Sequence, residues 1–340
     1  MKPIIVYPPT IDWDHLHQRP QQLLKALSQL DCLCVFCNIN MHKRYATGFS
    51  YMSDNLVLAN GISLNNALQW SRASYPHSPL IGYFTYPPHI VHMAKLHVDL
   101  ILFDSVDEPV GEFASWLPSY ATAVERSDVV IASAHSLVKR AVQHTKSQVY
   151  LIPNGCDYNH FHTAQTRQVI DWEPFNWGRP IIGYIGAIAP WLDRDLINKM
   201  GRSLPAYEFV FIGPLLHQKG MAFTNKNMHY LGSKNYADLP SYMSNFDYCL
   251  IPFKLTEMTK GVNPVKFWEY LASGHPILST PLPEIPQEYV TIITADTCCE
   301  SSLKLENRGR DERIKLARDN SWTERATNLL AILQRKLELG

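Results

Sequence analysis

The chain has 340 residues, of which 46% are hydrophobic and 18% charged, so it can build full cores and is long enough for two domains. Lysine plus arginine and aspartate plus glutamate both number 31, and this balance argues against a general electrostatic nucleic-acid binder. No apolar run reaches the roughly 18–20 residues of a membrane span, and the short run after Met1 is better interpreted as a first strand than as a signal peptide.

The first half of the chain alternates short apolar runs with helical patterns, which is typical of an α/β architecture. The apolar runs predict strands at Pro3–Tyr7, Leu33–Cys37, Leu56–Leu58, Leu80–Phe84, Leu100–Phe103, Val129–Ser133 and Val149–Ile152. Helices are predicted at Arg19–Leu30, Trp116–Arg126 and Ser133–His144, and the last of these begins with serines suited to capping.

Two of the seven cysteines, Cys34 and Cys37, have the spacing of a redox or zinc motif. They lie inside an apolar run that is typical of a buried strand, and no second pair completes a metal site. We therefore expect reduced core thiols and a cytoplasmic protein. A peripheral contact with the inner face of the membrane stays open.

The second half begins after a polar and aromatic stretch, Tyr158–Arg179, which we interpret as the linker between two domains, 1–175 and 176–321. A second series of strands is predicted at Pro180–Gly186, Glu208–Ile212, Met228–Leu231, Tyr248–Pro252, Pro276–Ser279 and Thr291–Ile293. A long helix from Trp322 to about Leu339 closes the chain. Two α/β domains that face each other leave a cleft between the carboxyl ends of their sheets, where ligands usually bind.

The segment Asn263–Leu278 is the most informative part of the chain. It predicts a loop, a short helix with proline at its first position, a stop at Gly274 and a buried strand. Lys266 and Glu269 are three residues apart and share one helical face near the N-terminus, where free N–H groups attract anions. The segment therefore predicts a cradle for a nucleotide diphosphate. The alternative is a solvent-exposed Glu–Lys pair worth about 0.3–0.5 kcal/mol.

Six segments, taken in order along the chain, carry a resemblance to a known family: Trp13–Leu24, Ile152–Asp157, Gly183–Ile188, Phe211–Pro214, Phe246–Pro276 and Asn320–Ala326. They resemble the glycosyltransferases with two Rossmann-like domains (the GT-B fold), and among these the group-1, or family-4-like, bacterial polysaccharide transferases of the teichuronic acid biosynthesis type. The resemblance implies two doubly wound α/β domains facing across a cleft, with the C-terminal helix, about 322–340, packing back on the first domain.

The same resemblance implies how the donor is held. Glu269 would bind the ribose hydroxyls, Lys266 would be the phosphate cation, and the loop Val262–Val265, including Asn263, would offer backbone N–H groups to the diphosphate. Many members of the wider superfamily have two glutamates separated by seven residues in this loop. Here Gly261 stands at the first position, which changes the expected sugar contacts and leaves the nucleotide assignment standing.

Further donor contacts are expected at the other strand ends of the second domain. Gly186 follows a strand and lacks the third glycine of a dinucleotide fingerprint, so a dehydrogenase is not favoured and the glycine would let the backbone approach the donor. Arg194 stands near the place where related proteins have a basic pair for the diphosphate. Ser233 and Tyr236 follow a strand where such folds hold the base, and an exposed loop tyrosine is the alternative there.

The loop after the first strand suits an acceptor sugar, because it offers an aromatic ring, carboxylates, imidazoles and a guanidinium: Trp13, Asp14, His15, His17 and Arg19. A metal at His15 and His17 is less favoured, since no further ligands of suitable spacing accompany them. Asp104 and Asp107 follow a predicted strand and, with His17, are the catalytic candidates. A carboxylate there would deprotonate the acceptor if configuration inverts, or orient it if configuration is retained. An N-cap cluster is the structural alternative.

We therefore expect a metal-independent glycosyltransferase that uses no cofactor and transfers a sugar from a nucleotide-diphosphate sugar to a glycan or glycolipid hydroxyl in surface polysaccharide synthesis. Its partners would be those two substrates, and no nucleic acid. Two alternatives stay open: a non-catalytic nucleotide-sugar-binding or partner subunit of a transferase complex, and a nucleotide-sugar epimerase on the same fold.

Overall fold

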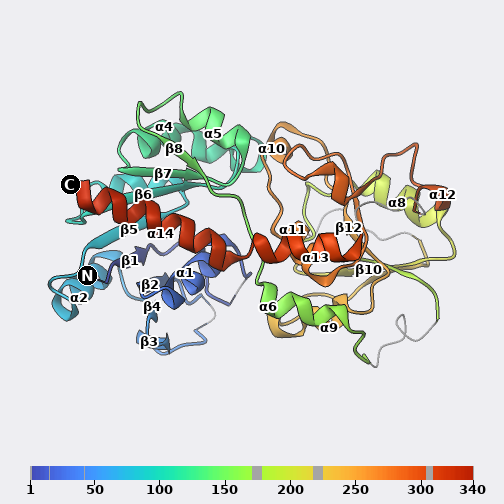
Figure 1. The fold of residues 1–340 in the computed structure, drawn as a ribbon, viewed down its shortest axis with the longest axis horizontal. Helices are drawn as coiled ribbons and strands as arrows, with labels where there is room; N and C mark the ends of the chain where they lie inside the picture. The colour runs from blue at the N-terminus through green and yellow to red at the C-terminus, as the bar shows by residue number, and fades with distance from the viewer. Residues whose placement is uncertain are drawn as a thin grey trace. The chain divides into compact units, whose positions relative to one another are not determined.

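The computed structural model describes residues 2–14, 16–41, 43–170, 178–216, 225–303 and 309–339. The chain divides into two compact units, Met1–Asn154 with Trp322–Gly340, and Gly155–Ser321. In Figure 1 the first unit runs from blue to green and includes the red C-terminal helix. The domain boundary expected at 175/176 lies outside the described residues.

The first unit is built on a sheet that, among the described residues, has eight strands in the order β3-β4-β2-β1-β5-β6-β7-β8. Neighbouring strands are parallel except β3 and β4, which are antiparallel. The strands are β1 Ile4–Tyr7, β2 Leu33–Asn38, β3 Gly48–Ser53, β4 Leu56–Asn60, β5 Leu80–Phe84, β6 Leu100–Ser105, β7 Val129–Ala132 and β8 Val149–Leu151. The strand order reverses between β1 and β5, whose carboxyl ends form the topological switch point.

The apolar runs predicted these strands, with the exception of β3. No residue of β3 is buried, so its sequence has no apolar run to mark it. It is an edge strand that pairs with β4 alone. The α/β class and the parallel pairing of β1, β2 and β4–β8 are therefore confirmed. Strand β3 was missed because it buries no apolar residue.

The helices of the first unit are α1 Arg19–Gln29, α2 Leu64–Ser74, α3 Ile90–Met93, α4 Leu117–Glu125, α5 His135–Ala141 and α14 Trp322–Leu339, with 3-10 turns η1 Pro87–His89 and η2 Gly111–Trp116. Pro20 stands in the first turn of α1, where its missing N–H costs nothing, and the helix buries Leu23, Leu24 and Leu27. The C-terminal helix α14 packs against α1 (Figure 1), which confirms its predicted return to the first domain.

The second unit has a smaller sheet, with six strands among the described residues in the order β11-β10-β9-β12-β13-β14, all parallel. The strands are β9 Ile181–Ile185, β10 Glu208–Ile212, β11 Met228–Tyr230, β12 Tyr248–Ile251, β13 Ile277–Ser279 and β14 Thr291–Ile292. The chain passes from β9 to β10 and β11 on one side and returns to β12 on the other. The switch point of this sheet therefore lies between β9 and β12.

The helices of the second unit are α6 Tyr158–Phe161, α8 Arg194–Ser203, α9 Leu239–Met243, α10 Glu257–Lys260, α11 Val265–Ser273, α12 Glu300–Leu303 and α13 Arg310–Asp319, with 3-10 turns η3 His162–Gln165, η4 Tyr236–Asp238 and η5 Gln287–Tyr289. The linker interpretation is wrong for residues 158–165, because α6 and η3 pack on α11 and bury Phe161 and Ala164. Two short segments that each bury a single residue are too brief to produce a helical period.

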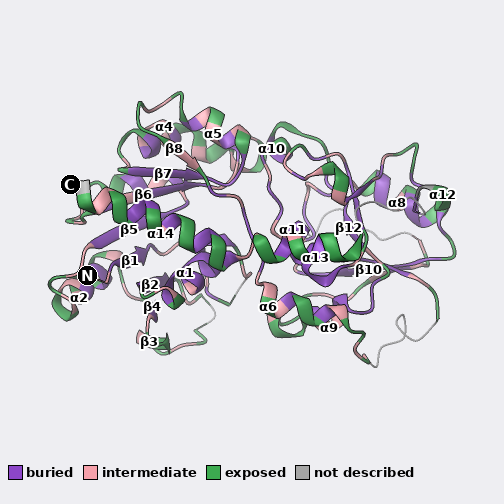
Figure 2. Cartoon of the chain, viewed as in Figure 1, coloured by how far each residue is buried: buried purple, intermediate pink, exposed green. Residues whose placement is uncertain are grey.

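Burial follows the sheets in both units, whose strands are mostly purple in Figure 2.

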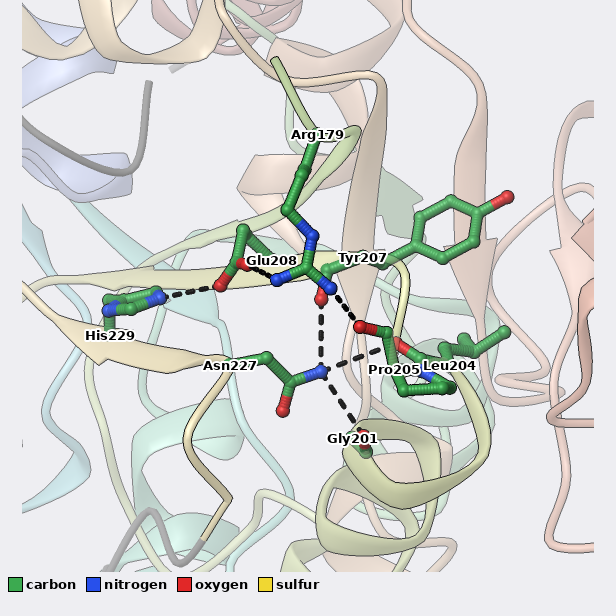
Figure 3. Close-up of polar contacts among 8 residues, drawn as sticks. All are labelled: Arg179, Gly201, Leu204, Pro205, Tyr207, Glu208, Asn227 and His229. Atoms are coloured by element: carbon green, nitrogen blue, oxygen red, sulfur yellow. Dashed lines mark hydrogen bonds and ion pairs between the residues drawn. The ribbon is translucent and has the colours of Figure 1, made fainter. Parts of the chain in front are cut away.

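A buried charge lies at the amino end of β10. Glu208 forms ion pairs with Arg179 and with His229, whose Nε2 lies 2.7 Å from Oε2 (Figure 3). Beside it, Asn227 donates hydrogen bonds from Nδ2 to the carbonyls of Gly201, Leu204 and Tyr207. Side chains thus satisfy the polar groups at this edge of the sheet.

Candidate functional site

Helix α11 follows β12, one of the two strands at the switch point of the second unit. Pro264 is its N-cap rather than its first helical residue, because ψ of 124° is extended. Gly274 ends the helix with φ of 75°, as predicted. No side chain caps the N-terminus, so the first N–H groups keep their capacity to bind an anion.

Lys266 lies in the first turn of α11 and is half-buried. Its Nζ is 5.0 Å from the ring centroid of Phe253 and 5.5 Å from that of Tyr184. Among the described residues no hydrogen bond or ion pair holds this ammonium, and the two rings lie within cation–π distance of it. Burial lowers the pKa of Lys266 to about 8, against the opposing charge of Glu269.

Glu269 lies one turn further along α11 and is only 8% exposed, so the alternative of a solvent-exposed pair is wrong. Burial raises the pKa of its carboxyl to about 7, Lys266 opposes this shift, and Asp157 adds to it. The described part of the chain offers its carboxylate no hydrogen-bond or ion-pair partner. A buried carboxylate without such a partner costs free energy. This is expected of a group whose partner is a bound ligand.

Gly186 follows β9, the other strand at the switch point, and lies against Lys266. A Cβ added to Gly186 would lie 2.8 Å from Cε and 3.1 Å from Nζ of Lys266, and φ there is +153°. Only glycine permits this approach. The loop after β9 is also tied to the loop after β12, because the Asp193 N–H donates to Pro252 (2.7 Å) and the Lys254 N–H donates to Trp191 (2.8 Å).

The structure therefore brings Gly186, Lys266 and Glu269 together at one switch point. Asn263 is buried, and its amide links the loop to α11 by accepting from Trp268 Nε1 at 2.9 Å and donating to Glu284 at 3.3 Å. Val262 and Val265 are half-buried on either side of it.

The other donor candidates have different surroundings. Arg194 is exposed at the start of α8, and Ser233 is exposed after β11. The ring of Tyr236 stacks on His160, with centroids 4.5 Å apart and planes at 17°, so the imidazole covers one of its faces. Base stacking on that face would require His160 to move.

In the first unit, Arg19 and Asp104 form a buried ion pair with Nε 2.7 Å from Oδ2. Tyr83 donates to the same oxygen at 2.9 Å, and Arg19 Nη1 donates to Pro153 and to Asn154 Oδ1. Arg19 Nη2 and Asp104 Oδ1 have no partner among the described residues. Arg19 therefore joins the carboxyl end of β6 to the segment that leaves the unit, and Asp104 is fully buried beneath it.

Asp107 lies three residues beyond Asp104 and is partly exposed. Burial raises the pKa of its carboxyl to about 7, and the charges of Asp104 and Glu108 add to this shift. Glu108 is ion-paired with Arg140, with 2.6 Å between Nε and Oε2. Asp107 is thus the carboxylate of this group that a substrate can reach.

The expected acceptor loop differs from its prediction at Trp13. The indole is only 5% exposed and makes a T-shaped contact with Phe36 in β2, so it belongs to the core. His17 contacts the edge of Trp13, with ring centroids 6.2 Å apart. Asp14 lies 3.8 Å from Arg44, and His15 lies outside the described residues.

Sequence reasoning missed Tyr184 and Phe253, the two rings beneath Lys266. Both occur in or beside apolar strand segments, where an aromatic residue is typical of the core, and only the fold brings them to the lysine.

No cluster of three or more His, Cys, Asp or Glu side chains in the described ranges is arranged to hold a metal ion. Cys34 and Cys37 are buried in β2 and unbridged, as predicted. None of the described helices combines the length and apolar composition that crossing a bilayer requires.

No protein-family model matches the chain. Among known sequences it is similar to TuaH of Bacillus subtilis, described as a teichuronic acid biosynthesis glycosyltransferase, with 24% identity over 225 residues. The match covers 59% of this chain and 55% of that protein, so it spans about half the length of this relative.

Three solved structures match nearly the whole chain. Sucrose-phosphate synthase of Thermosynechococcus elongatus has a TM-score of 0.72 at 14% identity over 100% of both chains. A trehalose-6-phosphate structure from E. coli bound with UDP-2-fluoro glucose has 0.69 at 10%, covering 98% of this chain and 99% of that one. Anabaena HepE with UDP and glucose has 0.64 at 12%, covering 98% and 100%. These likenesses confirm the predicted GT-B fold.

Proposed function

We propose that this chain, which has the fold of the GT-B glycosyltransferases, transfers a sugar from a nucleotide-diphosphate sugar to the hydroxyl of a glycan or glycolipid in surface polysaccharide synthesis. One observation carries the proposal: among the described residues, neither Lys266 nor Glu269 has a hydrogen bond or ion pair at the start of α11, beside the switch point of the second sheet. An unpaired cation, an uncapped helix start and an unpaired carboxylate match a diphosphate and a ribose. The likeness to TuaH supports the polysaccharide assignment.

In this proposal Lys266 and the N–H groups of α11 stabilise the diphosphate, which gains negative charge as the glycosidic bond breaks. Glu269 accepts hydrogen bonds from the ribose hydroxyls and fixes the nucleotide. Gly186 leaves room for the phosphates next to Lys266. Because fixed groups supply the positive charge, transfer should proceed in EDTA at the rate found with magnesium, and strict dependence on an added divalent ion would contradict this part of the proposal.

Binding of nucleotides tests the donor site directly. Calorimetry with UDP, GDP, ADP and dTDP should find one that binds, and Glu269→Ala should lose about 1.5–3 kcal/mol, or roughly 10–150-fold, in affinity for it. Glu257→Ala is the matched control, because Glu257 begins the preceding helix α10 but is exposed and paired with Lys260. If no nucleotide binds, the non-catalytic partner interpretation replaces the transferase.

Asp107 is proposed to act on the acceptor, as the base if configuration inverts or as an orienting group if it is retained. Asp107→Asn should lower kcat by about 10²–10⁴-fold and leave nucleotide affinity unchanged. A base must be ionised, so wild-type kcat should fall as pH drops below about 7. Glu112→Gln, which changes an exposed carboxylate in η2, serves as the control. An unchanged kcat in Asp107→Asn would remove this residue from the reaction.

A further inference from the structure

The hydroxyl of Tyr230, at the end of edge strand β11, donates a hydrogen bond of 2.9 Å to the carbonyl of Gly213. The N–H of Gly213 in turn donates to the carbonyl of Gly232 at 2.9 Å. The turn after β10 is therefore held to β11 on both sides. Tyr230 is 41% exposed, so this hydroxyl is not needed to fill the core.

The Gly213 turn is packed backbone to backbone on the Gly186 turn. Gly213 has φ of +141°, and a Cβ added to it would lie 2.0 Å from the carbonyl oxygen of Gly186. The Gly186 N–H also donates to Ile212 at 2.8 Å. Because no side chain separates the two turns, a displacement of one is passed to the other.

Gly186 completes the path, since it approaches the Lys266 side chain so closely that an added Cβ would clash with it. Lys266 has no described ion pair that would hold it if this backbone moved. We infer that Tyr230 is a positioning residue that places Lys266 for the donor diphosphate through the stacked turns at Gly213 and Gly186. This inference rests on the proposed function.

Tyr230→Phe keeps the ring and removes only the hydroxyl. We expect its affinity for the nucleoside diphosphate that the wild type binds to fall about fivefold, with a melting temperature at most a few degrees below that of the wild type. Tyr207→Phe is the matched control, because Tyr207 lies at the amino end of β10, away from the turns at Gly213 and Gly186. Its hydroxyl also points away from the contacts drawn in Figure 3. The control should bind like the wild type.

A double-mutant cycle with Lys266→Met separates positioning from a general structural role. If Tyr230 acts through Lys266, the fivefold loss caused by Tyr230→Phe should disappear in the Lys266→Met background. The same loss in both backgrounds would indicate that Tyr230 contacts the nucleotide directly or supports the fold in general, and would overturn the inference.

The two proposals fail in distinguishable ways. If the wild type binds no nucleoside diphosphate, the proposed function falls and the inference falls with it. If the wild type binds and Glu269→Ala weakens binding, but Tyr230→Phe binds like the wild type, the donor site stands and the positioning role alone is wrong.

Discussion

Buried charges at the amino ends of the strands of the second sheet (the amino edge) have protein partners, and those at the carboxyl ends (the carboxyl edge) do not among the described residues. At the amino edge, Glu208 is fully buried and paired with Arg179 and His229 (Figure 3). At the carboxyl edge, the described residues give neither Lys266 nor Glu269 a hydrogen bond or ion pair. Burial alone therefore does not distinguish a structural charge from a functional one. A charge that the fold has already satisfied supports the fold, and one that it has left unsatisfied is available to a ligand.

The largest effect expected from this comparison is a loss of protein stability when the ion pairs of the amino edge are broken. Glu208→Ala leaves Arg179 and His229 without their carboxylate and should lower the free energy of unfolding by about 3 kcal/mol, measured by urea denaturation. The affinity of the folded protein for its nucleotide should not change. Glu257→Ala, which breaks an exposed pair, should leave stability as it is. A Glu208→Ala variant with wild-type stability and weakened binding would break the comparison.

The next effect is a loss of nucleotide affinity, without a loss of stability, when a charge at the carboxyl edge is removed. Lys266→Met should weaken nucleoside diphosphate binding by about 2–3 kcal/mol, or roughly 30–150-fold, because the phosphate loses its cation. Stability should stay the same or rise, since the variant replaces a partly buried, unpaired ammonium with an apolar chain of similar length. Calorimetry and thermal unfolding on one preparation check both halves. A loss of stability equal to that of Glu208→Ala would show that Lys266 supports the fold.

The helix that carries the proposed donor site was predictable because the signals for it are local. The helix start, the Lys266–Glu269 spacing and the stop at Gly274 all lie within Asn263–Leu278, and α11 forms as expected. The strands followed from apolar runs for the same reason, because each run is buried in its own sheet. Helix α11 and most of the strands are therefore the predictions that the structure confirms.

Contacts between distant residues were not predictable. Arg19 and Asp104 are 85 positions apart, and no local pattern indicates that they pair or that Arg19 also holds Asn154. Trp13 looked like a sugar-binding ring because its loop is polar, whereas Phe36 and β2 bury it. In the same way, the rings of Tyr184 and Phe253 come together at Lys266 because β9 pairs with β12.

The smallest expected effect is a dependence of stability on pH, to which Lys266 and Glu269 contribute with opposite signs. Burial lowers the pKa of Lys266 from 10.5 to about 8, so between these values the unfolded chain holds a proton that the folded chain lacks, and stability should rise with pH. Burial raises the pKa of Glu269 from 4.5 to about 7, so in that window the folded chain holds the extra proton, and stability should fall as pH rises.

The same lysine titration should appear in binding. As pH rises through about 8, Lys266 loses its charge, and nucleoside diphosphate affinity should fall by at most about tenfold per pH unit. Lys266→Arg keeps its charge throughout this range, so its affinity should stay level wherever that of the wild type declines. Calorimetry of both proteins across this range makes the measurement. If both decline together, the titrating group is not Lys266, and the unpaired charge at the carboxyl edge is not the cation that holds the phosphate.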